Sequence, residues 1–401
     1  MNNVKTHSIV IAASVIIIAL NLRPAIAAIS PLVEQILNST TLSASDIGLL
    51  STLPILLMGL GALLAQPLRQ FLGEKSGITL GIAMISLACF SRIWGDRDGL
   101  MIISAIVAGL GIAVVQALLP GYIKRVFSKS ASGMIGLYSS AIVAGAALAA
   151  ASAVPLAEWL NWESALALWG APAVLAIMLW HVTFYKDKAK GGSQSTTKIA
   201  YRRDVRSLSL LMFFGVGTGV FMLILAWLPA YFSAHAMTAE TSGFLLTFFI
   251  VIELVTALLL SMKIKNIEDK RLLLLISIIS TVAGLVFLAL FPTQLSLISV
   301  ALLGLGIGIH FPLSLIVASE HFNNPQHAGN LTAYVQGGGY IVAATTPALA
   351  GWIRDSFGQI DIIWMIMGGM MALLTPLALS YSPQSYSIYY KRVTKAENEN
   401  L

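Results

Sequence analysis

Residues 99–122, GLMIISAIVAGLGIAVVQALLPGY, form an uncharged stretch of 24 residues in which apolar side chains predominate. A helix rises about 1.5 Å per residue, so this stretch is long enough to cross the roughly 30 Å hydrocarbon core of a bilayer. Lipid offers no partner to backbone N–H and C=O groups, and a lone segment satisfies them internally only as a helix. The stretch therefore predicts a transmembrane helix.

The whole composition resembles that of this stretch. Hydrophobic residues make up 57% of the 401, charged residues 10%, and the mean hydropathy is +0.84. A soluble domain carries about 25% charged residues. Cys89 is the one cysteine in the sequence, which excludes a disulfide framework and a metal site built from cysteines. We therefore expect lipid to be the solvent for much of the chain.

Eleven further apolar stretches have a length suited to crossing a bilayer. Each is expected to be helical for the reason given above, so the fold class is an all-α integral membrane protein with twelve transmembrane helices. The predicted spans are residues 8–36, 47–68, 76–94, 99–122, 132–157, 164–185, 207–232, 241–262, 272–291, 295–319, 328–353 and 360–382.

Lysine and arginine give these spans an orientation. With the N-terminus inside, 20 of the 24 basic residues fall on the inner side and 3 on the outer side, while Arg23 lies within the first span. Short cytoplasmic loops carry such an excess of basic residues. We therefore expect a multi-pass protein of the cell inner membrane with both termini in the cytoplasm. The same placement accounts for the net charge of +6 without nucleic acid as a partner.

The two halves of the chain repeat one another at an offset of about 195 residues. Gly109-Leu110-Gly111-Ile112 matches Gly304-Leu305-Gly306-Ile307, and similar strings open the second and eighth spans at 46–50 and 241–245. An even number of spans preserves orientation, so two parallel six-helix bundles are predicted, as in the major facilitator fold. The predicted division is an N-terminal bundle at 1–185, a cytoplasmic linker at 186–206, a C-terminal bundle at 207–383 and a cytoplasmic tail at 384–401.

Several strings are distinctive enough to compare with known families. They are residues 21–25 (NLRPA), 111–113 (GIA), 118–125 (LLPGYIKR), 136–139 (GLYS), 145–150 (GAALAA) and 227–229 (WLP), with Gln336, Gly339-Tyr340, Pro347 and Gly351 near the end. Together they resemble the cyanate/2-nitroimidazole transporter family of the major facilitator superfamily over nearly the whole chain. The resemblance implies a transporter whose cavity is lined or flanked by spans 1, 4 and 11.

Two strings depart from superfamily patterns. The loop after the second span has Gln70 about where an Asp is usual, so the resemblance rests on topology and on the strings above. Gly145 is followed by Ala146, whereas drug/proton antiporters commonly have Gly-Pro in the fifth span. This second departure weighs against a multidrug exporter.

Arg23 is predicted to lie near mid-depth of the first span, where a permanent cation is costly. A guanidinium can bind carboxylates and other planar oxyanions through two parallel hydrogen bonds. Pro24 removes a backbone donor and loosens the helix at the same point. An anion site is the functional interpretation, and a structural ion pair or a packing contact to backbone carbonyls is the alternative.

Two titratable groups also fall deep in spans. Glu253 could bind protons, pair with a cation or bond to a neighbouring helix. His310 could couple transport to protons, because histidine titrates near neutral pH, or could form a plain interhelical hydrogen bond. Polar groups in membrane helices often only join one helix to another. The uncharged side chains that we nevertheless predict to bind substrate are Asn21, Gln116, Tyr138, Trp227, Gln336 and Tyr340.

These features predict a monomeric secondary transporter that moves a small solute, anionic or planar and nitrogen-containing, by alternating access and with protons as a possible coupling ion. An exporter of toxic compounds is the alternative within this class. An integral-membrane receptor or enzyme is the alternative from another class, but the sequence has no catalytic cluster, no metal-binding constellation and no large soluble domain. It also lacks the G-x-x-x-x-G-K-[ST] string of ATP-driven pumps, and no cofactor is expected.

Overall fold

The structure, a computed structural model, describes residues 2–95, 97–127, 131–184, 204–322, 325–358 and 360–386. Helices and short connections make up these ranges, and no strand occurs within them. The helices are α1 Asn2–Leu20, α2 Pro24–Ala27, η1 Ser30–Leu32, α3 Val33–Ser39, α4 Ala44–Leu63, α5 Ala65–Leu72, α6 Glu74–Ser91, η2 Arg92–Trp94, α7 Asp98–Val126, α8 Ala131–Trp159, α9 Trp162–Leu168, α10 Gly170–Phe184, α11 Val205–Ala234, α12 Ala239–Lys263, η3 Ile264–Asn266, α13 Arg271–Leu290, α14 Ser296–Ser319, α15 Pro325–Phe357, α16 Asp361–Ala372 and α17 Thr375–Ser380.

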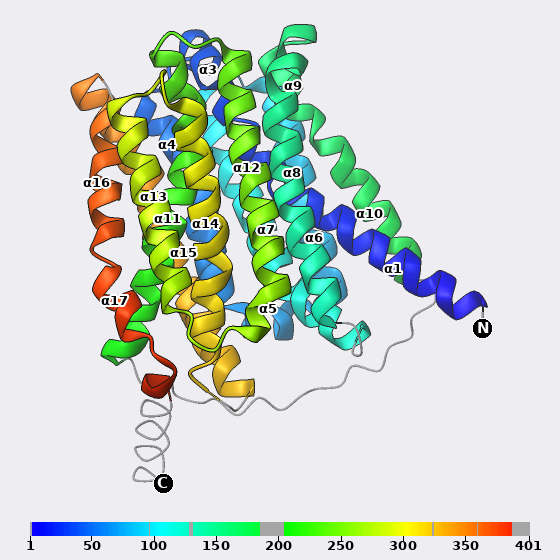
Figure 1. The fold of residues 1–401 in the computed structure, drawn as a ribbon. Helices are drawn as coiled ribbons and strands as arrows, with labels where there is room; N and C mark the ends of the chain where they lie inside the picture. The colour runs from blue at the N-terminus through cyan, green and yellow to red at the C-terminus, as the bar shows by residue number, and fades with distance from the viewer. Residues whose placement is uncertain are drawn as a thin grey trace.

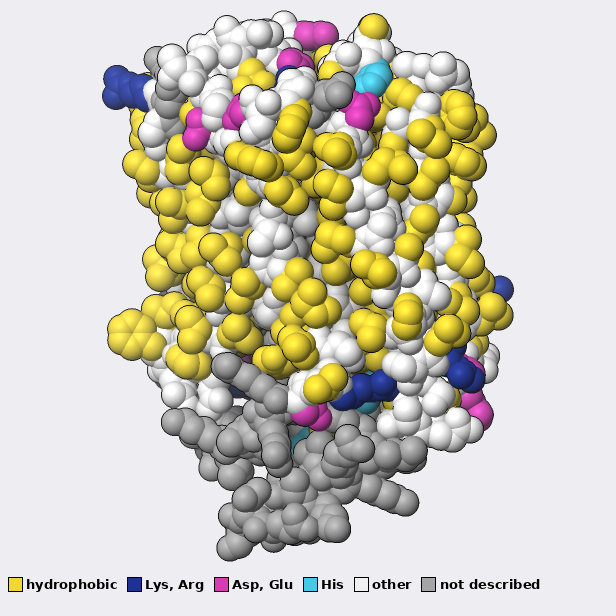
Figure 2. All heavy atoms as spheres, turned by 90° about the vertical axis from the view of Figure 1, so that its left-hand side faces the viewer, with side chains coloured by type: hydrophobic (Ala, Val, Ile, Leu, Met, Phe, Trp, Pro, Cys, Tyr) yellow, Lys and Arg dark blue, Asp and Glu magenta, His cyan; other side chains and the backbone are white. Residues whose placement is uncertain are grey.

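Eleven segments in the described part of the chain are long and apolar enough to cross a membrane. The remaining predicted span, the eleventh at 328–353, is α15, which is long enough but less apolar because it carries Gln336, three successive glycines and several threonines. It packs against α4 and α11, so little of its surface needs to match lipid. Figure 2 shows apolar side chains covering the middle of the visible face, with charged side chains toward the two ends. The predicted twelve-helix membrane fold is confirmed.

The helices form two bundles with matching internal contacts. In the first half α7 packs on α4 and α6, α10 on α6, and α1 on α8; in the second, α14 packs on α12 and α13, α16 on α13, and α11 on α15. The bundles meet where α4 packs on α15 and α8 on α12 (Figure 1). The exact boundaries proposed for the two domains stay a prediction, and most of the linker and tail lies outside the described residues.

Glycines permit the close contact between α4 and α15. A Cβ at Gly48 would lie 2.6 Å from the Pro347 carbonyl oxygen, and one at Gly59 would lie 2.8 Å from the Gly337 carbonyl oxygen. These distances are far below van der Waals contact, so larger residues would push the helices apart. Small residues allow helix backbones to approach in this way within membranes.

The first predicted span, 8–36, is not one continuous helix. It comprises α1, a non-helical turn at residues 21–23, and then α2, η1 and α3. Pro24 occupies the first position of α2, where its missing N–H costs nothing. Arg92, buried at the start of η2, donates from Nη1 to the Ala25 carbonyl at 2.7 Å and so supports the interrupted backbone. The sixth and twelfth spans are likewise divided, between α9 and α10 and between α16 and α17.

Candidate functional site

A cavity of about 490 Å³ lies between the two bundles. The turn after α1 and helices α4, α7 and α8 supply one side of its wall, and α11, α12, α14 and α15 supply the other. The lining extends from Arg23 to Ser261, two residues before the end of α12. The cavity therefore reaches from the middle of the protein toward the end at which α4, α7 and α12 terminate.

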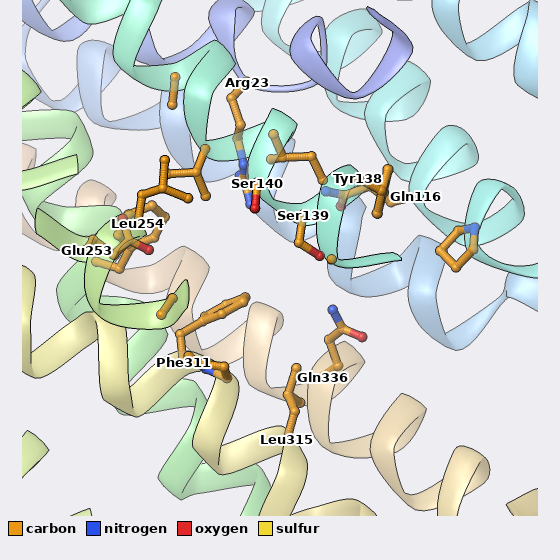
Figure 3. Close-up of a pocket in the computed structure, with 18 of the residues that line it drawn as sticks. Arg23, Gln116, Tyr138, Ser139, Ser140, Glu253, Leu254, Phe311, Leu315 and Gln336 are labelled. Carbon is orange, nitrogen blue, oxygen red and sulfur yellow. The ribbon is translucent and has the colours of Figure 1, made fainter. Parts of the chain in front are cut away.

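Arg23 contributes a buried cation to this wall. The side chain is 5% exposed and projects from the turn between α1 and α2 into the cavity (Figure 3). Within the described part of the chain it makes one hydrogen bond, 3.7 Å from Nη1 to the Met58 sulfur, and no ion pair. A thioether is a weak acceptor, whereas a guanidinium has five N–H donors. Most of the hydrogen-bonding capacity of Arg23 is thus free to act on a ligand.

Glu253 faces the same cavity from the other bundle. It is 6% exposed, and its Oε2 has no hydrogen-bond partner among the described residues. In Figure 3 its carboxyl group lies across the cavity from Tyr138 and Gln116, with Arg23 between the two sides. A buried carboxyl oxygen without a partner is costly, so Glu253 stays a candidate for ligand binding or protonation.

Four of the predicted uncharged residues lie in the wall with Arg23 and Glu253. Gln116 and Tyr138 come from the N-terminal bundle, and Gln336 and Tyr340 come from α15. Their amide and hydroxyl groups offer both donors and acceptors, and the tyrosine rings offer flat apolar surface. The structure thus brings together six residues that are spread over more than 300 positions of the sequence.

Asn21 and Trp227 do not line the cavity. The Asn21 amide donates to the Ile17 carbonyl at 2.8 Å and so completes the last turn of α1. The Trp227 Nε1–H donates to the Pro347 carbonyl at 3.0 Å, and the Arg354 guanidinium lies 5.7 Å from its ring. Both side chains serve helix ends or helix contacts in this structure.

His310 also lies away from the cavity, buried among α11, α13 and α14. Its Nε2 is 3.0 Å from the Phe213 carbonyl oxygen, its Nδ1 is 3.4 Å from the Ser277 hydroxyl, and its ring stacks on that of Phe213. Gly217 provides the space, because a Cβ there would overlap the imidazole ring. The interhelical hydrogen bond, one of the two interpretations of this histidine, is the one that the contacts favour.

The sequence reasoning missed several residues of the wall. They are small, apolar or hydroxyl-bearing side chains with no signal of their own, such as Met58, Ser139, Ser140, Phe221, Ser261 and Phe311. Ser139 belongs to the 136–139 string, but its residue type does not mark it as a site residue. Hydroxyl groups are frequent in membrane helices and usually bond to their own backbone, so their type does not reveal which of them face a cavity.

The end of the protein opposite the cavity mouth is held closed by contacts between the bundles. The Arg354 Nη2 is 2.8 Å from the Glu34 Oε1, and the Asp355 carboxylate accepts from the backbone N–H of Ala44 at 3.0 Å and of Ser45 at 2.8 Å. Slightly deeper, the Thr52 hydroxyl donates to the Ala344 carbonyl at 2.8 Å. These contacts tie α3 and α4 to α15.

At the other end, α11, α14 and the residues after α17 meet around His321. The Arg206 Nε–H donates to the His321 Nε2 at 3.0 Å, and the His321 Nδ1–H donates to the Val317 carbonyl at 2.7 Å. The imidazole is therefore neutral, since Nε2 must accept. Burial, with the Arg206 charge adding to it, lowers the pKa of His321 from 6.5 to about 4.

Membrane-crossing helices in two bundles around one cavity that contains a buried cation define a polytopic carrier of small solutes. The sequence matches the Major Facilitator Superfamily over residues 11–344 and 210–391. The chain is 30% identical to the cyanate transport protein CynX of Escherichia coli (strain K12) over 92% of this chain and 96% of that protein. It is 29% identical to the 2-nitroimidazole transporter of the same organism over 92% of this chain and 94% of that protein.

A solved structure, the crystal structure of a D-xylose-proton symporter, superposes with a TM-score of 0.77 over 94% of this chain and 99% of that one, at 18% identity. That likeness shows the fold. The chain belongs to the major facilitator superfamily, in the branch that includes the cyanate and 2-nitroimidazole transporters, and it is a transporter rather than an enzyme. The predicted family is confirmed.

Proposed function

We propose that this protein is a secondary active transporter of the inner membrane that carries a small solute, anionic or planar and nitrogen-containing, by alternating access. The observation that carries this proposal is Arg23, a buried guanidinium that faces the cavity between the bundles with a thioether as its hydrogen-bond partner. A cation at this depth persists only if a ligand or a protein group offsets its desolvation. The relatives that transport cyanate and 2-nitroimidazole support a solute of this chemistry.

The closed outer end and the cavity mouth at the opposite end support alternating access. With both termini cytoplasmic, as the basic residues predict, the cavity mouth faces the cytoplasm, and the Arg354–Glu34 and Asp355–Ser45 contacts close the outer end. Rocking of one bundle against the other would break these contacts and open the cavity outward. In this proposal the structure corresponds to the inward-facing state.

In this proposal Glu253 is the residue that couples transport to protons. It is the predicted proton carrier that faces the cavity, whereas both ring nitrogens of His310 contact protein groups elsewhere. We expect Glu253→Gln to abolish accumulation driven by a proton gradient while counterflow exchange continues, because exchange needs substrate binding without net proton movement. Accumulation by this variant at the wild-type level would remove Glu253 from coupling.

The proposal is tested by uptake of radiolabelled cyanate and 2-nitroimidazole into proteoliposomes, with and without a proton gradient. Arg23→Lys keeps the charge but loses the paired donors, so we expect a drop of about tenfold or more in uptake. Arg97→Lys, at an exposed position outside the cavity, is the matched control and should transport normally. Uptake by Arg23→Lys at the wild-type level would show that Arg23 is structural and would refute its role in binding the solute.

A further inference from the structure

The cavity presents a cation on one bundle and a carboxyl group on the other, and no N–O approach within 4.0 Å joins Arg23 to Glu253 in the described part of the chain. Each of the two groups is more than nine-tenths buried. An ion pair would satisfy both without a ligand. Their separation leaves the guanidinium donors and one carboxyl oxygen directed at the same enclosed space.

The neighbours of Glu253 on its own helix do not offset the free-energy cost of burying its carboxyl group. Its neighbours in the wall are Ile250, Leu254 and Ala257, none of which can donate a hydrogen bond from its side chain. Oε2 has no partner among the described residues, although buried carboxyl oxygens are normally bonded. A ligand with an N–H or O–H group is the chemical species that would satisfy this oxygen.

The charge balance of the wall argues in the same direction. One guanidinium and one carboxyl group, when both are ionised, give the centre of the site no net charge. A bare anion would gain from Arg23 but would leave Oε2 unsatisfied and would be repelled by an ionised Glu253. A neutral solute with an acceptor at one end and a donor at the other would satisfy both groups, and the aromatic walls at Phe311 and Tyr340 suit a flat molecule.

We infer that the solute bridges the two bundles, with a planar acceptor group bound by Arg23 and an N–H or O–H donor bound by Glu253. This inference rests on the function proposed above and narrows its substrate class to neutral planar compounds that combine both groups. Glu253 is then a specificity-determining residue. Its removal should abolish the preference for the donor without abolishing recognition of the acceptor.

The test uses two probes that differ in one N–H group. These are 2-nitroimidazole and 1-methyl-2-nitroimidazole, with cyanate as a small anion that has no donor. Dissociation constants are measured by calorimetry on the purified full-length protein at pH 6 for the wild type, Glu253→Gln, Glu253→Leu and Arg23→Lys. Size-exclusion chromatography and thermal melting establish that each variant is folded.

We expect the wild type to bind 2-nitroimidazole about tenfold or more tightly than its N-methyl derivative, since an unpaired buried polar group costs about 1–3 kcal/mol. Glu253→Gln keeps an acceptor oxygen and should retain the preference, although it cannot carry a proton. Glu253→Leu has no acceptor and should bind the two probes equally. Arg23→Lys should weaken both by a similar factor.

Three results would overturn the inference. In the first, Glu253→Leu still prefers 2-nitroimidazole to its N-methyl derivative as strongly as the wild type does. In the second, the wild type binds the two probes equally or binds neither. In the third, the wild type binds cyanate more tightly than 2-nitroimidazole. Failure of the proposed function has a different signature, which is unchanged binding and uptake in Arg23→Lys. The two ideas can therefore fail separately.

Discussion

Asp355 should set the balance between the closed and the open outer end, and Asp355→Asn is the change that isolates this effect. The carboxylate accepts from the backbone N–H groups of Ala44 and Ser45 in the first turn of α4, and also from the Ser45 hydroxyl. The helix has its own capping box between Ser43 and Asp46. Loss of Asp355 therefore weakens the contact between the bundles rather than the helix.

The size of the effect follows from three hydrogen bonds and a helix terminus. Asparagine keeps one acceptor oxygen and loses the charge. A hydrogen bond to a charged group is worth about 1.5–3 kcal/mol and a carboxylate at a helix N-terminus about 0.3–1 kcal/mol. Asp355 is solvent-exposed, so these values must be discounted for screening. We expect a net loss of about 1–2 kcal/mol, which corresponds to a shift of about 5- to 30-fold toward the outward-open state.

The assay is the alkylation rate of a cysteine placed at Ala348, which packs against Gly48 in the closed interface, in a Cys89→Ala background. A membrane-impermeant maleimide added outside reacts at a rate proportional to the open population. Asp361→Asn is the matched control, because Asp361 lies at the same end but contacts Tyr231 and His235 within its own bundle. A change of less than twofold for Asp355→Asn, or an equal increase for the control, would refute the reasoning.

Three further predictions concern stability and topology. The pKa of His321 is about 4 in the folded protein and 6.5 when unfolded, so the unfolded state binds more protons between these two pH values. The melting temperature should therefore fall as the pH drops from 7 to 5. His321→Gln should flatten that profile. Gly217→Ala should lower the melting temperature by several degrees, because its Cβ would overlap the His310 ring, whereas Gly369→Ala, which meets open space, should not. A reporter that works only in the cytoplasm should be active when it is fused after residue 195. Activity there of a reporter that works only outside the cytoplasm would contradict the predicted orientation.

The candidate site was only partly predictable. Arg23 and Glu253 stood out because a charge deep in an apolar segment is costly and has to be explained. Trp227 and Asn21 belong to the strings that carry the family resemblance, but the structure uses their polar groups at helix contacts outside the cavity. Ser139 and Phe311 gave no signal, since their side chains are common in membrane helices whether or not they face a cavity.

The sequence by itself determined the number of spans and predicted their orientation, while Pro24 predicted a loosened helix at the point where the structure interrupts the first span. It did so because lipid imposes a local rule: each crossing segment must satisfy its own backbone and present apolar side chains outward. The Arg23-Pro24 pair violates that rule where the helix is interrupted. The lower hydropathy of α15 likewise reflects a helix enclosed largely by other helices.

Only the tertiary structure decided which faces of the helices meet. Most spans are apolar on all sides, so their sequence periodicity does not separate the surface toward lipid from the surface toward a neighbouring helix. The convergence of Arg23, Glu253 and Gln336 on one cavity depends on packing between segments more than 80 positions apart. His310 lies outside the cavity because its ring fits into the space left by Gly217 on another helix. Such contacts arise from the fit of whole helices and cannot be read along one chain.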